Sequence, residues 1–130
     1  MQTIRTAKPA RADPAADGAI VTKAVLRAAA RLGVSNRALS RILGLSEASV
    51  SRMGSGTYTL APHDKAFEIA VLFVRLFRSL DATMSGDDAA ARGWLHSENL
   101  ALGGVPLEMI QSLTGLVNVV GYLDARRALV

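Results

Sequence analysis

The 130-residue sequence predicts an all-α protein. Apolar residues recur at intervals of three and four through most of the chain, which is the period of a helix that buries one face. Serine, aspartate, proline and glycine stand where these stretches begin and end, as helix caps and stops do. Nowhere do β-branched residues alternate with polar ones, so the sequence predicts no strand.

The first twenty residues are rich in alanine and proline and show no helical period, so we expect a disordered arm over 1–20. A first helix is expected from Thr22, as its N-cap, to the stop at Gly33. Its apolar side is formed by four residues at helical spacing: Val25, Leu26, Ala29 and Leu32.

Two short helices and a tight turn follow. Ser35 is expected to cap a helix that continues through Leu43 to Gly44, and Ser46 to cap the next one, which stops at the glycines around Ser55. A longer helix is expected over 64–80, and it is apolar nearly all round. Such a helix must be surrounded, so it either lies between the two halves of the chain or also forms a dimer interface.

The C-terminal part predicts three more helices. The first covers 87–97 and has Trp94 and Leu95 on its apolar side; after a glycine pair, Pro106 starts a short one and the last runs from Leu116 to about Ala128. We therefore divide the chain into the arm 1–20, a helical domain over 21–62, a connecting core helix over 63–82, and a C-terminal domain over 83–130.

The composition and the N-terminal sequence indicate where in the cell the protein acts. The absence of cysteine excludes disulfides, thiolate metal sites and a cysteine nucleophile. The longest apolar stretch, over 66–77, is interrupted by Glu68 and Arg75 and is shorter than the roughly 20 residues that a membrane helix needs. The N-terminus lacks the apolar region of a secretory signal. We expect a soluble, cytoplasmic protein with no membrane partner.

Charge divides the chain unevenly. Residues 1–60 carry nine basic and three acidic residues, a net charge of +6, whereas residues 61–130 carry six basic and eight acidic residues, a net charge of −2. A basic half favours a polyanionic partner, and a nearly neutral, apolar half favours protein contacts. The alternative is that the basic residues are solvated helix surface.

The segment from Asn36 fits a twenty-residue helix-turn-helix. Leu39 and Leu43 take the inner positions of the first helix, and a large side chain in place of Ser40 would push the two helices apart. Gly44 suits the left-handed turn. Leu45 and Val50 close the core.

This stretch, SNRALSRILGLSEASVSRMGSG, resembles the Xre type of bacterial DNA-binding domain. The resemblance implies that the helix beginning at Ser46 is the recognition helix. Arg52 then suits guanine, Glu47 cytosine, and Ser51 a phosphate or either base type, while Arg37 and Arg41 would hold the DNA backbone. The full set of candidate DNA-binding residues is Arg37, Arg41, Glu47, Ser49, Ser51 and Arg52.

The recognition helix presents only one outward cation, so the alternative is a degenerate domain kept for dimerisation. Domains of this type usually bind paired half-sites as dimers.

The C-terminal stretch ARGWLHSENLALGGVPLEMIQSLTGLVNVVGYLDARRALV resembles the toxin-binding domain of the Xre/MbcA/ParS antitoxins. The residues that carry the resemblance are Trp94, Leu95, Asn99, Leu102, Gly103, Gly104, Pro106, Leu107, Gly115, Val119, Val120 and Leu123. These residues anchor the core or set turns and helix starts. The family often has Pro in place of Glu98 and Thr in place of Ser112, and both are interpreted as surface or cap changes.

The resemblance implies an antitoxin that neutralises a RES-domain toxin, a NAD-consuming protein similar to ADP-ribosyltransferases, and that binds its operator DNA for autorepression. A homodimer and a hetero-oligomer with the toxin are expected. Our hypothesis is that an exposed last turn enters the NAD cleft of the toxin, where an arginine takes the pyrophosphate position. The candidate toxin-binding residues are Leu123, Arg126, Arg127, Leu129 and Val130.

A second interpretation stays open for this end of the chain. The arginines suit the negative end of a helix dipole, and this alone would explain them. Deletion of 124–130 separates the two readings, because the toxin hypothesis predicts that it abolishes inhibition while leaving the fold intact.

Nothing in the sequence indicates catalysis or a cofactor. His63 and His96 stand far apart and are expected at the surface, and Asp87 with Asp88 fits a helix start better than a carboxylate pair. No phosphate-binding, dinucleotide, zinc-protease or nucleophile-elbow motif is present. The chain is predicted to be no enzyme. The rivals are a helix-turn-helix transcriptional repressor without a toxin partner and an adaptor whose helix-turn-helix is vestigial.

Overall fold

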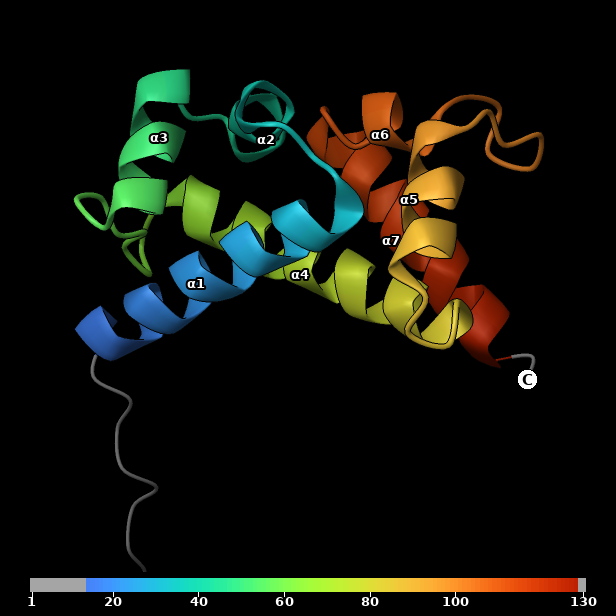
Figure 1. Cartoon of the computed structure of the whole chain (residues 1–130), viewed down its shortest axis with the longest axis horizontal. Helices are drawn as coiled ribbons and strands as arrows, with labels where there is room; N and C mark the ends of the chain where they lie inside the picture. Colours follow the sequence, from blue (N-terminus) through green and yellow to red (C-terminus); the bar gives the residue numbers. More distant parts are fainter. Residues whose placement is uncertain (1–13, 129–130) are drawn as a thin grey trace, which may run out of the picture.

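The computed structural model describes residues 14–128, which form seven α-helices and no strand (Figure 1). The only extended pairing in this range is an isolated bridge between Asn99 and Gly104. The all-α prediction is therefore confirmed. In chain order the helices are α1 (Pro14–Leu32), α2 (Asn36–Leu43), α3 (Glu47–Ser55), α4 (Lys65–Thr83), α5 (Asp88–His96), α6 (Pro106–Met109) and α7 (Leu113–Ala128).

The first helix begins earlier than the sequence indicated. The predicted arm 1–20 is wrong for residues 14–20, because α1 starts at Pro14, a residue that suits the first turn of a helix, and continues through an alanine-rich stretch that favours helix. Thr22 is not an N-cap. Its buried hydroxyl donates to the Gly18 carbonyl at 2.6 Å and accepts from the Leu60 amide at 3.0 Å, which ties α1 to the loop before α4. The rest of the predicted arm, 1–13, lies outside the described residues.

The α2–α3 hairpin agrees with the prediction in detail. Ser35 and Ser46 each accept a hydrogen bond from the amide three residues ahead, as N-caps do. Gly44 adopts φ 71°, the left-handed conformation that ends α2. Ser40 is buried at the crossing, and the expected apolar residues Leu39, Leu43 and Val50 are buried with it.

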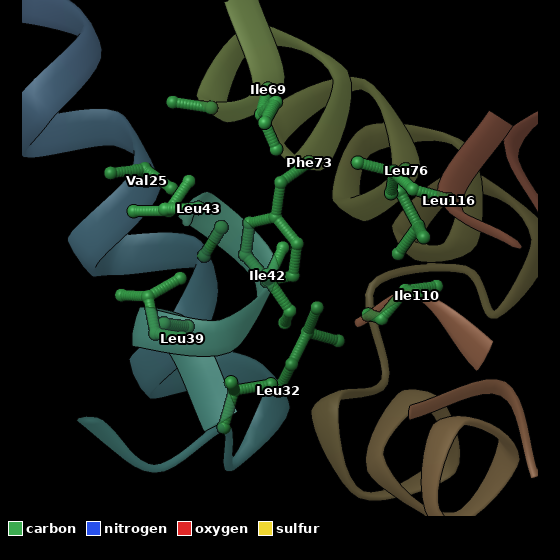
Figure 2. Packing of buried hydrophobic residues seen from close by; sticks show 14 of the residues in the cluster. Val25, Leu32, Leu39, Ile42, Leu43, Ile69, Phe73, Leu76, Ile110 and Leu116 are labelled. Carbon is green, nitrogen blue, oxygen red and sulfur yellow. The ribbon is translucent and has the colours of Figure 1, made fainter. Parts of the chain in front are cut away.

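Helix α4 joins the two halves of the molecule, as one of the two sequence interpretations expected. In Figure 1, α1 and the α2–α3 hairpin lie toward one end of it and α5–α7 toward the other. Figure 2 shows Phe73 directed toward Ile42 of the hairpin, and Leu76 directed toward the side where Leu116 of α7 lies. Both are fully buried in one hydrophobic cluster. The predicted domain boundaries at 62 and 82 stay predictions, since a single core runs across them.

The C-terminal turns explain several residues that carried the resemblance. The Asn99 amide donates to the Gly104 carbonyl at 2.8 Å, and the Asn99 side chain accepts from the Leu102 amide at 3.1 Å, which closes the predicted reversal. Helix α7 begins at Leu113, three residues earlier than predicted, because Ser112 caps it by accepting from the Gly115 amide. A Cβ atom on Gly115 would lie 1.8 Å from the Met109 carbonyl oxygen, so only glycine fits this helix crossing.

Arg31 connects the two halves on the outside. Its guanidinium group bonds Asp81 at 3.1 Å and Asp88 at 2.9 Å and lies 4.7 Å above the centroid of the Phe77 ring. The hydrogen bond from Arg31 lowers the pKa of the Asp88 carboxyl. Asp87 caps α5, so both aspartates serve the helix start, as predicted. None of the helices within 14–128 has the length and apolar character that crossing a membrane requires.

Candidate functional site

The outer face of α3 carries the predicted recognition residues. Glu47, Ser51 and Arg52 are exposed, whereas Ser49 is half-buried. The Ser49 hydroxyl accepts hydrogen bonds from the Ser46 hydroxyl at 3.0 Å and from Arg52 Nη2 at 3.2 Å. Ser49 therefore positions Arg52 over the first turn of α3.

The two candidate phosphate-binding residues lie on α2. Arg37 and Arg41 are exposed and four residues apart, so they share one side of the helix opposite its buried residues. Within the described part of the chain, neither guanidinium group has a protein partner. Both charges are therefore available to a ligand.

The C-terminal candidates divide into three groups. Leu123 is 1% exposed, so the prediction that it belongs to an exposed surface is wrong. It lies on the side of α7 that packs into the core, with Leu116, Val119 and Val120. Arg126 and Arg127 are exposed as predicted. Leu129 and Val130 lie outside the described residues.

The two arginines of the last turn are each held by a neighbour. Arg126 donates to the Tyr122 hydroxyl at 3.1 Å and lies 5.6 Å above the centroid of the Tyr122 ring, which itself stacks on Trp94. Arg127 donates to the Ser79 hydroxyl of α4 at 3.1 Å. Both line a polar hollow at the end of α4 together with Ala82, Thr83 and Ser85. The arrangement suits a bound anion, because two guanidinium groups converge on one opening.

A polar network behind this hollow fixes the last turn to α4. The Asp124 carboxylate accepts from the Ser79 hydroxyl at 2.8 Å and forms an ion pair with Arg75. The hydrogen bond from Ser79 lowers the pKa of the Asp124 carboxyl, and Arg75 adds to this effect. The sequence did not predict this network. Arg75 and Ser79 lie more than forty residues from Asp124, so no local spacing could have revealed the network.

Three exposed apolar side chains of the C-terminal half were also missed. Leu100 is 94% exposed at the tip of the Asn99–Gly104 turn. Leu113 and Val117 are each about half exposed and lie one turn apart on α7. A large apolar side chain held in water on an ordered turn is typical of a protein contact surface. A helical wheel of α7 could have indicated Leu113 and Val117, but only with the correct helix start.

Both histidines lie at the surface, as predicted. His63 and His96 are both exposed, and the His96 ring shares a hydrogen bond with the Arg92 carbonyl. Residues 14–128 contain no group of three histidine or carboxylate residues arranged to hold a metal ion.

Comparison with protein families finds two matches that together cover most of the chain. Residues 11–75 match the antitoxin Xre-like helix-turn-helix domain. Residues 79–128 match the antitoxin Xre/MbcA/ParS C-terminal toxin-binding domain. No curated protein matches the chain.

Proposed function

Because the chain belongs to the Xre/MbcA/ParS antitoxins, we propose that it neutralises a RES-domain, NAD-consuming toxin by blocking the active site, and that it represses its own operon as a dimer. Membership of this family makes the chain an antitoxin with a helix-turn-helix domain and a toxin-binding domain. These families bind and do not catalyse, so the prediction of a non-enzyme is confirmed. A transcriptional repressor without a toxin partner does not account for the C-terminal match.

The last turn of α7 is our candidate for the inhibitory element. Its two arginines project from an ordered helix end and are held by Tyr122 and Ser79, so little side-chain freedom is lost when they bind. Arg126 or Arg127 would bond the pyrophosphate position of the NAD cleft, and Leu129 and Val130 would follow it into the cleft. Leu123 is left out of this surface because it is buried.

The exposed apolar residues of the same half extend the proposed contact. Leu113 and Val117 form a short apolar stripe on α7, and Leu100 stands out from the neighbouring turn. Burial of apolar area against the toxin would supply affinity that two exposed arginines do not. The cationic end would then determine where this surface docks.

The hairpin is our candidate for operator binding. We propose that Arg52 bonds a guanine and that Arg37 and Arg41 bond phosphates, with Glu47 and Ser51 as further contacts. The support comes from the availability of these charges, since Arg37 and Arg41 have no competing partner within 14–128. If the hairpin is instead vestigial, no salt-dependent DNA binding will be measured.

A titration tests the toxin proposal directly. NAD consumption by the RES-domain protein encoded beside this chain is measured while the full chain is added. The proposal predicts that activity stops at a fixed stoichiometric ratio. Undiminished NAD consumption with excess antitoxin would overturn it.

A truncation then locates the inhibitory element. Deletion of 124–130 would also remove Asp124, whose carboxylate ties α7 to Ser79 and Arg75. A variant that ends at Ala125 keeps these contacts and removes only the last turn and the residues after it. It should keep its helical circular dichroism and lose inhibition, and retained inhibition would remove the last turn from the proposed site.

A further inference from the structure

A polar hollow lies where the end of α3 meets α1. One wall is formed by α1, with Lys23, and the other by the last turn of α3 and the loop after it, with Ser55 and Tyr58. In Figure 1 this loop lies between α3 and α1. Among the residues that the structure describes, none of α2 lines the hollow. The hollow is therefore separate from the surface that carries Arg37 and Arg41.

The hollow opens at the end of the candidate recognition face. Glu47, Ser51 and Ser55 are all exposed and follow each other at intervals of four, so they share one side of α3. Ser55 is also a wall of the hollow. Helix α3 has nine residues and is about 14 Å long, whereas the major groove is about 12 Å wide. With the first turn of α3 at the base edges, its last turn lies at the edge of the groove, where the phosphates are.

Two hydrogen-bond donors in the hollow have no competing partner. Lys23 is exposed, and its ammonium group has no protein partner within residues 14–128. The Tyr58 ring packs against the core, and its hydroxyl is also without a partner in this range. Among the described residues that line the hollow, none is acidic. A lysine and a tyrosine hydroxyl are both groups that donate to DNA phosphates.

The end of α3 is arranged so that it repels an anion less than an ordinary helix end. The free carbonyl groups at a helix C-terminus carry partial negative charge. Here the hydroxyls of Ser55 and Thr57 both donate to the Arg52 carbonyl, at 3.2 and 3.4 Å, and the Thr57 amide donates to it at 2.8 Å. These bonds offset the negative charge, and Lys23 adds a full positive charge beside it.

Helix α1 is fixed tightly against the loop that carries Tyr58. The Thr22 hydroxyl accepts from the Leu60 amide at 3.0 Å. A Cβ atom at Gly18 would overlap the Leu60 carbonyl oxygen, so the backbones approach more closely than another residue would allow. Lys23 follows Thr22 directly. Its backbone and that of Tyr58 therefore hold a fixed spacing, and little backbone freedom is lost when a ligand binds between them.

We propose that this hollow binds one phosphate of the operator backbone, with the Lys23 ammonium group as the cation and the Tyr58 hydroxyl as a second donor. The inference rests on the proposed operator binding and extends the DNA interface to α1, outside the helix-turn-helix segment. Arg37 and Arg41 would bond phosphates from α2, and Lys23 would do so from α1. The phosphate contacts from both helices then fix the orientation of α3 without selecting a base sequence.

The salt dependence of DNA binding tests the cation. The affinity of the full chain is measured at several salt concentrations for a duplex from the promoter region of its own operon and for a scrambled duplex of equal length. Lys23→Gln should weaken binding roughly tenfold on both duplexes, because a phosphate contact carries no sequence information. It should also reduce the log–log salt slope by about 0.9 for each subunit bound. An unchanged slope would overturn the proposal.

Arg126→Gln is the matched control, since it removes one exposed positive charge at the far end of the molecule. It should leave the salt slope unchanged. Equal losses in the two variants would show that net charge matters and the hollow does not. Lys23→Arg keeps the charge and should keep the slope.

A second substitution tests the hollow itself. Tyr58→Phe removes only the hydroxyl and keeps the ring in the core, so the thermal stability should be retained while DNA affinity falls roughly threefold to tenfold. If Lys23 and Tyr58 bond the same phosphate, adding Tyr58→Phe to Lys23→Gln should cost less than it does alone. Fully additive losses would place the two groups at different phosphates and overturn the shared site.

The outcomes separate this inference from the operator proposal. A wild-type chain without salt-dependent DNA binding would overturn both. A wild-type chain that binds its operator, together with a Lys23→Gln variant that binds equally well, would overturn the hollow alone. All of these variants except Arg126→Gln should still inhibit the toxin normally, because the hollow lies outside the candidate toxin-binding surface.

Discussion

The α2–α3 hairpin and the last turn of α7 are both exposed and cationic, but different kinds of contact hold them in place. In the hairpin, the side-chain hydrogen bonds join residues at most five positions apart, such as Ser46 with Ser49 and Ser49 with Arg52. At the end of α7, Asp124 and Arg127 bond Ser79, more than forty residues away. The first surface is organised by its own segment, and the second depends on the core that brings α4 and α7 together.

This difference explains which structural features could be predicted from the sequence. The caps, the left-handed Gly44 and the buried Ser40 of the hairpin were predictable, because local spacing determines each of them. The burial of Leu123 was not, since it depends on which side of α7 packs against α4. The early start of α1 has a different explanation, since Pro14 and the alanines that follow it are local signals for a helix. Thr22 has the residue type of a cap, but its actual partner is the distant Leu60 amide.

A cavity in the shared core should lower the stability of the whole protein more than any other single change described below. Phe73→Ala should destabilise the protein by about 3–5 kcal/mol, because Phe73 is fully buried where α4 meets the hairpin. If both surfaces depend on one core, urea unfolding should stay a single transition at lower denaturant concentration. Val71→Ala, at an exposed position of the same helix, is the control and should change stability little. Two separate transitions in the wild-type chain would contradict the single core.

Replacing the glycine at the start of α7 should disturb the C-terminal surface and leave the hairpin intact. Gly115→Ala should cost about 1–3 kcal/mol, because its methyl group would overlap the Met109 carbonyl. Gly121→Ala is the matched control within the same helix, since nothing lies within 4 Å of the added methyl group. We expect the first variant to weaken toxin inhibition and the second to leave it unchanged. Equal thermal stability of the two variants would show that the crossing tolerates a side chain.

A substitution in the α3 N-cap should disturb the hairpin and leave the C-terminal surface intact. Ser46→Ala removes the N-cap of α3 and the bond that orients Ser49, with an expected cost of about 1 kcal/mol. DNA affinity should fall while toxin inhibition is retained. Ser51→Ala, at an exposed position of the same helix, keeps the cap and should leave stability unchanged. A thermal melt of both variants measures the difference.

Acidification should produce the smallest effect. The pKa of Asp88 lies below its ordinary value of 3.8 because Arg31 donates to it. The ion pair therefore stabilises the folded state at neutral pH, and this contribution is lost as the pH falls through the lowered pKa. We expect the stability difference between the wild-type chain and Asp88→Asn to shrink below pH about 4. Urea unfolding across this range checks it, and a difference that stays constant from neutral to acidic pH would contradict the assignment.

We propose that one folded core carries two separate binding surfaces. The most direct measurement compares Arg52→Ala with a variant in which Arg126 and Arg127 are both alanine, each tested for operator binding and for inhibition of NAD consumption by the toxin. We expect Arg52→Ala to lose about 1–3 kcal/mol of operator affinity and to inhibit the toxin normally. The double variant should bind the operator normally and lose inhibition. If either variant lost both activities while remaining folded, the two surfaces would not be separate.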